Sequence, residues 1–106
     1  ADYTELVKSF QALESKPRIY VCRPCPVPEP GNYGINEKNL QEWIKRVDQI
    51  AKDMNLGVID MHKALEDKPQ LLPDRVHPNA AGAGEMAAAA YKVITGKKAP
   101  KPEEEK

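Results

Sequence analysis

The residues best suited to chemistry lie in the segment "LLPDRVHPNAAG", residues 71–82, where an acid and a histidine stand three positions apart. A histidine titrates near neutrality, so it can take up and return a proton. A carboxylate bonded to its Nδ1–H would leave Nε2 facing a nucleophile. A tight turn can bring Asp74 and His77 into that contact, and Pro78 restricts the backbone beside the histidine. The pattern therefore has two interpretations, a turn that begins a helix or the acid–base half of a hydrolase site.

The nucleophile of such a site is harder to find. The serines of the chain are Ser9 and Ser15. Ser9 falls on the polar side of a predicted helix, and Ser15 precedes a lysine and Pro17. Neither lies at a strand-to-helix turn, where an activated serine would be expected. We therefore expect no esterase activity from the chain alone.

Other side chains with functional potential are more ambiguous. Tyr33, in a loop rich in Pro and Gly, is a candidate for stacking on a sugar, and Arg75 could bind a substrate carboxylate or hydroxyl. Arg75 could equally be a solvated arginine. His62 is interpreted as an ordinary loop histidine, with a role next to the site or a metal as the alternative, and Asp60 as a turn or cap residue. Trp43 is expected in the core rather than as a sugar platform.

The two cysteines, Cys22 and Cys25, have the C-x-x-C spacing of redox pairs. Such pairs usually begin a helix, but the sequence that follows here is "PVPEPGNYG", which cannot be helical. We expect instead that Cys22 is a buried strand residue and that Cys25 lies in a loop. A thiol–disulfide protein remains an alternative.

Composition restricts the partners and the size of the domain. The chain has 106 residues, one domain at most, with 16 basic and 16 acidic residues. Such a balance does not favour nucleic acid or an anionic membrane, and no apolar stretch is long enough to span a bilayer. No metal or cofactor motif is present. The chain begins directly as a helix without an initiator Met, so we expect it to be trimmed from something longer.

Two short strands frame the strongest helical pattern of the chain. "RIYVC", residues 18–22, and "GVID", residues 57–60, are β-prone. Between them, Asn36 is a plausible N-cap, and Asn55 with Gly57 supplies stop signals. The apolar stripe of this helix comprises Leu40, Trp43, Ile44, Val47, Ile50, Ala51 and Met54. A strand–helix–strand unit of this kind predicts two parallel strands.

Two further helices flank this unit. Apolar residues from Tyr3 to Leu13 predict a helix that stops before Pro17, and Asn79 is expected to cap the last helix. "MHKALEDKP", residues 61–69, is expected to form a short helical turn or loop. The tail, residues 96–106, has charged residues and prolines but no apolar anchors, so it is predicted to be disordered. Residues 1–95 are predicted to form the part of the folded domain that this chain contains.

Three helices with one-sided apolar faces need more partner surface than two strands offer. The predicted fold class is therefore α/β, with this chain as half of a doubly wound domain. The remaining strands would pair along the open edge of its sheet.

The segments "DRVHPNAAGAGEMA" and "RIYVCRPCPVP", followed by "GINEKNLQEWIKRVDQIAKDMNLGVIDMHKAL", resemble the SGNH hydrolases, also called GDSL-type esterases. The resemblance covers roughly residues 3–95 and is strongest to bacterial carbohydrate-esterase and sialate-O-acetylesterase-like members. It implies a flavodoxin-like three-layer α/β/α domain, of which this is the C-terminal half. It also implies that Asp74 and His77 are the acid and base of a Ser-His-Asp triad acting on acyl esters, with O-acetyl esters of carbohydrate as the expected substrates.

The chain departs from this family by lacking its G-D-S, second glycine and G-x-N-D blocks. Asn32, in "GNYG", lies in the wrong order to be the oxyanion asparagine and is not assigned. The resemblance therefore implies a partner, the N-terminal half of the same domain, as a second chain or a missing segment. The alternative is a non-catalytic α/β binding or assembly module that retains the motif as a relic. The sequence does not fix the compartment, although members of the resembling type are often exported.

Overall fold

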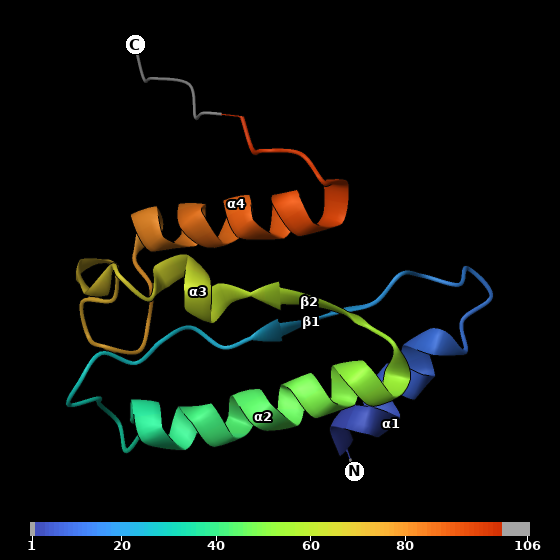
Figure 1. The fold of residues 1–106 in the computed structure, drawn as a ribbon, viewed down its shortest axis with the longest axis horizontal. Coiled ribbons are helices and arrows are strands. Elements are labelled where there is room, and N and C mark those ends of the chain that lie inside the picture. The colour runs from blue at the N-terminus through green and yellow to red at the C-terminus, as the bar shows by residue number, and fades with distance from the viewer. Residues whose placement is uncertain (1, 101–106) are drawn as a thin grey trace.

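The computed structural model describes residues 2–100, which form four α-helices, a short 3-10 helix and two strands (Figure 1). In chain order these are α1 Asp2–Gln11, β1 Tyr20–Arg23, α2 Glu37–Met54, β2 Gly57–Asp60, α3 Met61–Leu65, the 3-10 helix η1 Pro69–Leu71 and α4 Ala80–Thr95. Three of these helices were expected from the sequence. The fourth, α3, is the one-turn helix within the segment interpreted as a helical turn or loop.

The two strands are parallel, as the strand–helix–strand pattern predicts. Their register pairs Tyr20 with Gly57 and Arg23 with Asp60, and α2 provides the connection between them. In Figure 1 the strands lie between α2 on one side and α4 on the other. The predicted α/β class and the parallel pairing are thus confirmed.

The helix ends follow the local chemistry of their capping residues. The side chain of Asn36 accepts a hydrogen bond from the Asn39 amide at the start of α2, and that of Asn79 accepts one from the Gly82 amide at the start of α4. Asn55 adopts a left-handed conformation at the end of α2, and Gly96 does so at the end of α4. Each of the two N-cap side chains stabilises its helix by about 1 kcal/mol.

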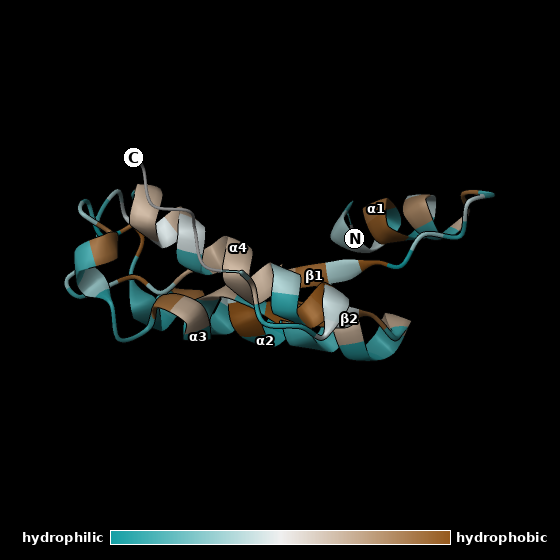
Figure 2. Cartoon of the chain, turned by 90° about the horizontal axis from the view of Figure 1, so that it is seen from above, coloured by the Kyte–Doolittle hydropathy of each residue, from teal (hydrophilic) through white to brown (hydrophobic). Residues whose placement is uncertain are grey.

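The molecule is a thin slab, with extents of 42 × 39 × 17 Å. Seen from above, α1 stands away from the other helices, on the side of β1 that does not pair with β2 (Figure 2). Several large apolar side chains of α1 and the turn after it are about half exposed, among them Leu6 at 57% and Phe10 at 49%. Within the described residues, the open edge of β1 and this helix face are therefore left without an element that covers them.

The small core lies where α2 meets the strands and the loop after β1. Leu40 and Ile44 of α2 are buried together with Val27, and Val21 and Ile59 are buried in the strands. Trp43, expected in the core, is 61% exposed, so that expectation is wrong. Leu40 and Ile44 turn toward the sheet and Trp43 lies on the flank of the stripe, where its ring is stacked by the Arg46 guanidinium at 5.6 Å.

Cys22 also differs from expectation, because it is exposed rather than buried. Side chains alternate along a strand, and in β1 the buried one is the neighbouring Val21. Cys25 lies in the loop after β1, as expected, and is partly buried.

The chain after α4 runs without regular structure through residues 97–100, and residues 101–106 of the predicted disordered tail lie outside the described range. Over the described residues, none of the helices combines the length and apolarity needed to cross a membrane.

Candidate acid–base site

The candidate site lies beyond the C-terminal ends of the two strands. One of its loops, residues 31–35, follows β1, and the other, residues 72–79, follows α3 and η1. Both occupy the same end of the slab in Figure 1, opposite the end where α2 leads into β2. Parallel sheets place their functional sites at this end, because the loops that leave neighbouring strands converge there.

Asp74 organises the second loop through three hydrogen bonds. Its Oδ1 accepts the backbone N–H groups of Val76 at 2.9 Å and of His77 at 2.6 Å, and its Oδ2 lies 2.6 Å from Nδ1 of His77. The backbone N–H of His77 is the largest cause that lowers the pKa of Asp74 well below its usual value, followed by the His77 ring and the Val76 amide. Asp74 is therefore a carboxylate at neutral pH.

That carboxylate decides which nitrogen of His77 carries the proton. An ionised carboxylate can only accept, so Nδ1 must donate, and in the neutral ring Nε2 is left with a free lone pair. The His77 side chain is 71% exposed, which leaves it open to a reacting group. Asp74 and His77 thus lie in the arrangement that their spacing suggested, with the acid holding the base. Their catalytic role stays a prediction.

The structure also brings both candidate substrate-binding residues next to this pair. Tyr33 is 67% exposed, and its ring meets that of His77 edge to face, with centroids 5.9 Å apart. Arg75 donates from Nε to the carbonyl of Gly31 at 2.8 Å. The Tyr33 ring is thus largely exposed, whereas the Nε of Arg75 is engaged in holding two loops together; the role of either residue in binding a substrate stays a prediction.

A second histidine cluster lies at the start of α2. His62 is on α3 rather than in a loop, and its Nε2 lies 2.8 Å from Oε2 of Glu37. Oε1 of Glu37 accepts the Val27 amide at 2.9 Å, and the pKa of Glu37 is lowered by this bond against the opposing effect of burial. His62 and Glu37 are 25 positions apart in the sequence, and Val27 and Glu37 are 10 positions apart. No local sequence pattern indicates either contact.

Asp60 acts partly as the expected cap, because its side chain accepts the Lys63 amide at the start of α3. It also accepts a bond of 2.7 Å from Arg23, which binds Asp48 of α2 through two further nitrogens. The carboxylate of Asp48 raises the pKa of Arg23, and the network ties both strand ends to α2.

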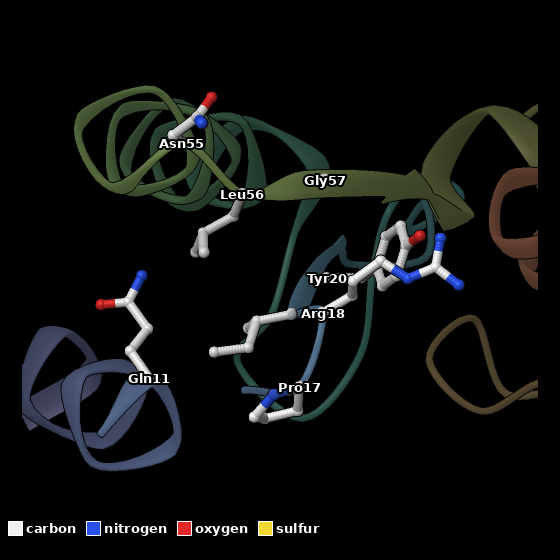
Figure 3. A pocket seen from close by; sticks show the side chains of 8 residues that line it. Gln11, Pro17, Arg18, Tyr20, Asn55, Leu56 and Gly57 are labelled. Carbon is white, nitrogen blue, oxygen red and sulfur yellow. The ribbon is translucent and has the colours of Figure 1, made fainter. Parts of the chain in front are cut away.

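The structure places no serine beside His77. The hydroxyl of Ser9 donates to the Glu5 carbonyl within α1, and Ser15 lies in the exposed turn after that helix. The pocket drawn in Figure 3 lies near this end of the chain, between Gln11 of α1 and the segments that enter β1 and β2. Because it adjoins the N-terminal ends of the strands, it lies at the opposite end of the sheet from the candidate site.

The two cysteines of the C-x-x-C pair are not bonded to each other. Burial raises the pKa of Cys25, whose Sγ contacts Sδ of Met86 at 3.6 Å, and both cysteines are free. Within residues 2–100, no three His, Cys, Asp or Glu side chains are grouped so that they could hold a metal ion.

Comparison with known proteins shows what this chain is similar to. The sequence model of the GDSL-like lipase/acylhydrolase family matches residues 1–84. An acetylxylan esterase of Xylanibacter ruminicola is 38% identical over 78 residues, which are 72% of this chain and 16% of that protein. The fold is similar to the esterase domain of the ORF1 protein from the zebrafish ZfL2-1 retrotransposon, with a TM-score of 0.72 and 21% identity over 91% of this chain and 56% of that one. The chain therefore spans only part of the length of both.

Proposed function

The chain belongs to the GDSL-like lipase/acylhydrolase family, and we propose that it supplies the acid and the base of a Ser-His-Asp triad that hydrolyses O-acetyl esters of carbohydrate. The observation that carries this proposal is the 2.6 Å contact between Asp74 Oδ2 and His77 Nδ1 on an exposed loop at the C-terminal end of the sheet. The match to an acetylxylan esterase supports an acetylated polysaccharide as the substrate.

The proposed mechanism assigns one task to each group. His77 Nε2 takes the proton of a serine hydroxyl as the oxygen attacks the ester carbonyl, and returns it to the leaving alcohol. Asp74 holds the ring and stabilises the imidazolium that forms. Water then hydrolyses the acyl-enzyme with the same base, which releases acetate.

The serine and the oxyanion donors come, in this proposal, from an N-terminal segment of the same domain. The unpaired edge of β1 and the exposed apolar face of α1 support it, since both would be covered by further strands and helices. That segment could be continuous with this chain or a separate polypeptide.

The test compares acetate release from acetylated xylan by three preparations: the complete protein that contains this chain, the same protein with His77→Asn, and the chain alone. We expect activity only in the first. A control variant, His62→Asn, removes the other histidine and should retain activity. Turnover by the chain alone, or full activity of His77→Asn, would refute the assignment, and an inactive complete protein would favour a non-catalytic module.

A further inference from the structure

The loop of residues 31–35 is closed on itself. Asn32 and Ile35 exchange two backbone hydrogen bonds, of 3.0 and 2.8 Å. Gly31 has a φ of 81°, and a Cβ added there would lie 2.1 Å from the Ile35 carbonyl oxygen, so only glycine fits. The loop is therefore a compact unit rather than a free excursion of the chain after β1.

Two hydrogen bonds fasten this unit to the loop that carries the acid and base. Nδ2 of Asn32 donates to the backbone carbonyl of Asp74 at 3.0 Å, and Nε of Arg75 donates to the carbonyl of Gly31 at 2.8 Å. Oδ1 of Asn32 accepts the Tyr33 amide at 2.9 Å. Both ends of the Asn32 amide are thus engaged, which fixes its orientation.

The backbone is strained where the two loops meet. Tyr33 has a φ of 54° and Arg75 a φ of 68°, in the left-handed region that residues with a side chain rarely adopt. Such conformations cost about 1–3 kcal/mol each and persist only when the surroundings hold them. Here they orient the Asp74–Arg75 peptide toward Asn32, and they place the Tyr33 ring against His77.

We propose that the 31–35 loop is a clamp on the acid–base loop, and that Asn32 and Arg75 are positioning residues that act through Asp74 on the His77 ring. Asp74 is held from two sides: its carbonyl by Asn32, and its carboxylate by the amides of Val76 and His77. Fixing the carbonyl limits rotation of the peptide that follows Asp74, and so keeps Oδ2 on Nδ1 of His77. The assignment of this geometry to catalysis rests on the proposed function.

The decisive variant is Asn32→Asp in the full chain. Aspartate has the same shape and can still accept the Tyr33 amide, but its second oxygen cannot donate to the Asp74 carbonyl and repels it. Asn39→Asp is the matched control, since it adds the same charge at an exposed position of α2. Asn32→Ala removes the donor without adding charge.

The readout is the nitrogen NMR spectrum of histidine-labelled protein above the usual histidine pKa. The chain has two histidines, so His62, bound to Glu37, serves as an internal reference. In the parent protein we expect His77 to be mainly the Nδ1–H tautomer. In Asn32→Asp and Asn32→Ala its two nitrogen shifts should move toward each other, while those of His62 stay unchanged and those of His77 in Asn39→Asp match the parent.

Two results would overturn the clamp: His77 shifts that are unchanged in both Asn32 variants, or His62 shifts that move together with those of His77 in both, which would indicate a global effect. Neither of these two results counts against the proposed function, provided that His77 of the parent protein is the Nδ1–H tautomer. A parent His77 that lacks this tautomer would count against both.

Discussion

Asp74→Asn tests the acid of the proposed triad with little change in shape. An asparagine at this position can still accept the amides of Val76 and His77 through Oδ1, so two of the three hydrogen bonds made by Asp74 remain. The third is reversed, because an amide NH₂ would replace Oδ2 opposite Nδ1 of His77. The ring must then accept at Nδ1 and carry its proton on Nε2.

The size of the effect follows from this reversal. With the proton on Nε2, His77 cannot take a proton from a serine, and no carboxylate stabilises the imidazolium. In a serine protease with a Ser-His-Asp triad, an acid-to-amide change of this kind lowers kcat about ten-thousand-fold with the geometry intact. We expect a loss of this order in the complete protein, with an unfolding transition close to that of the parent because the turn keeps its backbone bonds.

The assay is the steady-state hydrolysis of an acetyl ester by the complete protein, together with thermal unfolding. Asp67→Asn is the control, since it removes the same charge at an exposed position between α3 and η1. It should leave kcat unchanged. A kcat for Asp74→Asn within tenfold of the parent, in a folded protein, would refute the role assigned to Asp74.

Three further outcomes are expected. Gly31→Ala should destabilise the chain by about 1–3 kcal/mol in urea unfolding, because Gly31 has a positive φ and an added Cβ would collide with the Ile35 carbonyl. The control is Gly84→Ala, a helical site with open space around it, which should be neutral or stabilising. Equal effects of the two substitutions would contradict the packing of the loop. The lowered pKa of Asp74 means that its contribution to the turn is fully present above the unfolded pKa of about 3.9 and is lost as pH falls through the lower folded value. The side-chain carboxyl carbon of Asp74 should therefore show no carboxylate protonation step above about pH 4, and a protonation midpoint above that pH would be inconsistent. The chain alone should associate in sedimentation experiments through the edge of β1 and the apolar face of α1, and a stable, well-protected monomer would argue against the half-domain proposal.

What the sequence determined by itself is local. Asn36, Asn55 and Asn79 were identified as helix ends because a capping side chain or a left-handed residue acts on backbone groups within one turn. The pairing of Asp74 with His77 was accessible for the same reason, since three residues separate them and a single turn joins them. The parallel strands followed from the one apolar stripe between them.

Only the tertiary structure decided the contacts between distant segments. The bonds of Asn32 to Asp74 and of Arg75 to Gly31 span 42 and 44 residues. A single hydrogen bond across such a separation leaves no periodicity in the sequence. Asn32 therefore had no assignable role, and Arg75 had two interpretations, as a substrate-binding residue or as a solvated arginine.

The exposure of Trp43 and Cys22 was decided in the same way. A helical stripe or an alternating strand indicates which side chains can be buried, but burial also requires a neighbouring element to cover them. In a slab two strands wide, that cover extends over Leu40, Ile44 and Val21 and not over the flank of α2 or the far side of β1.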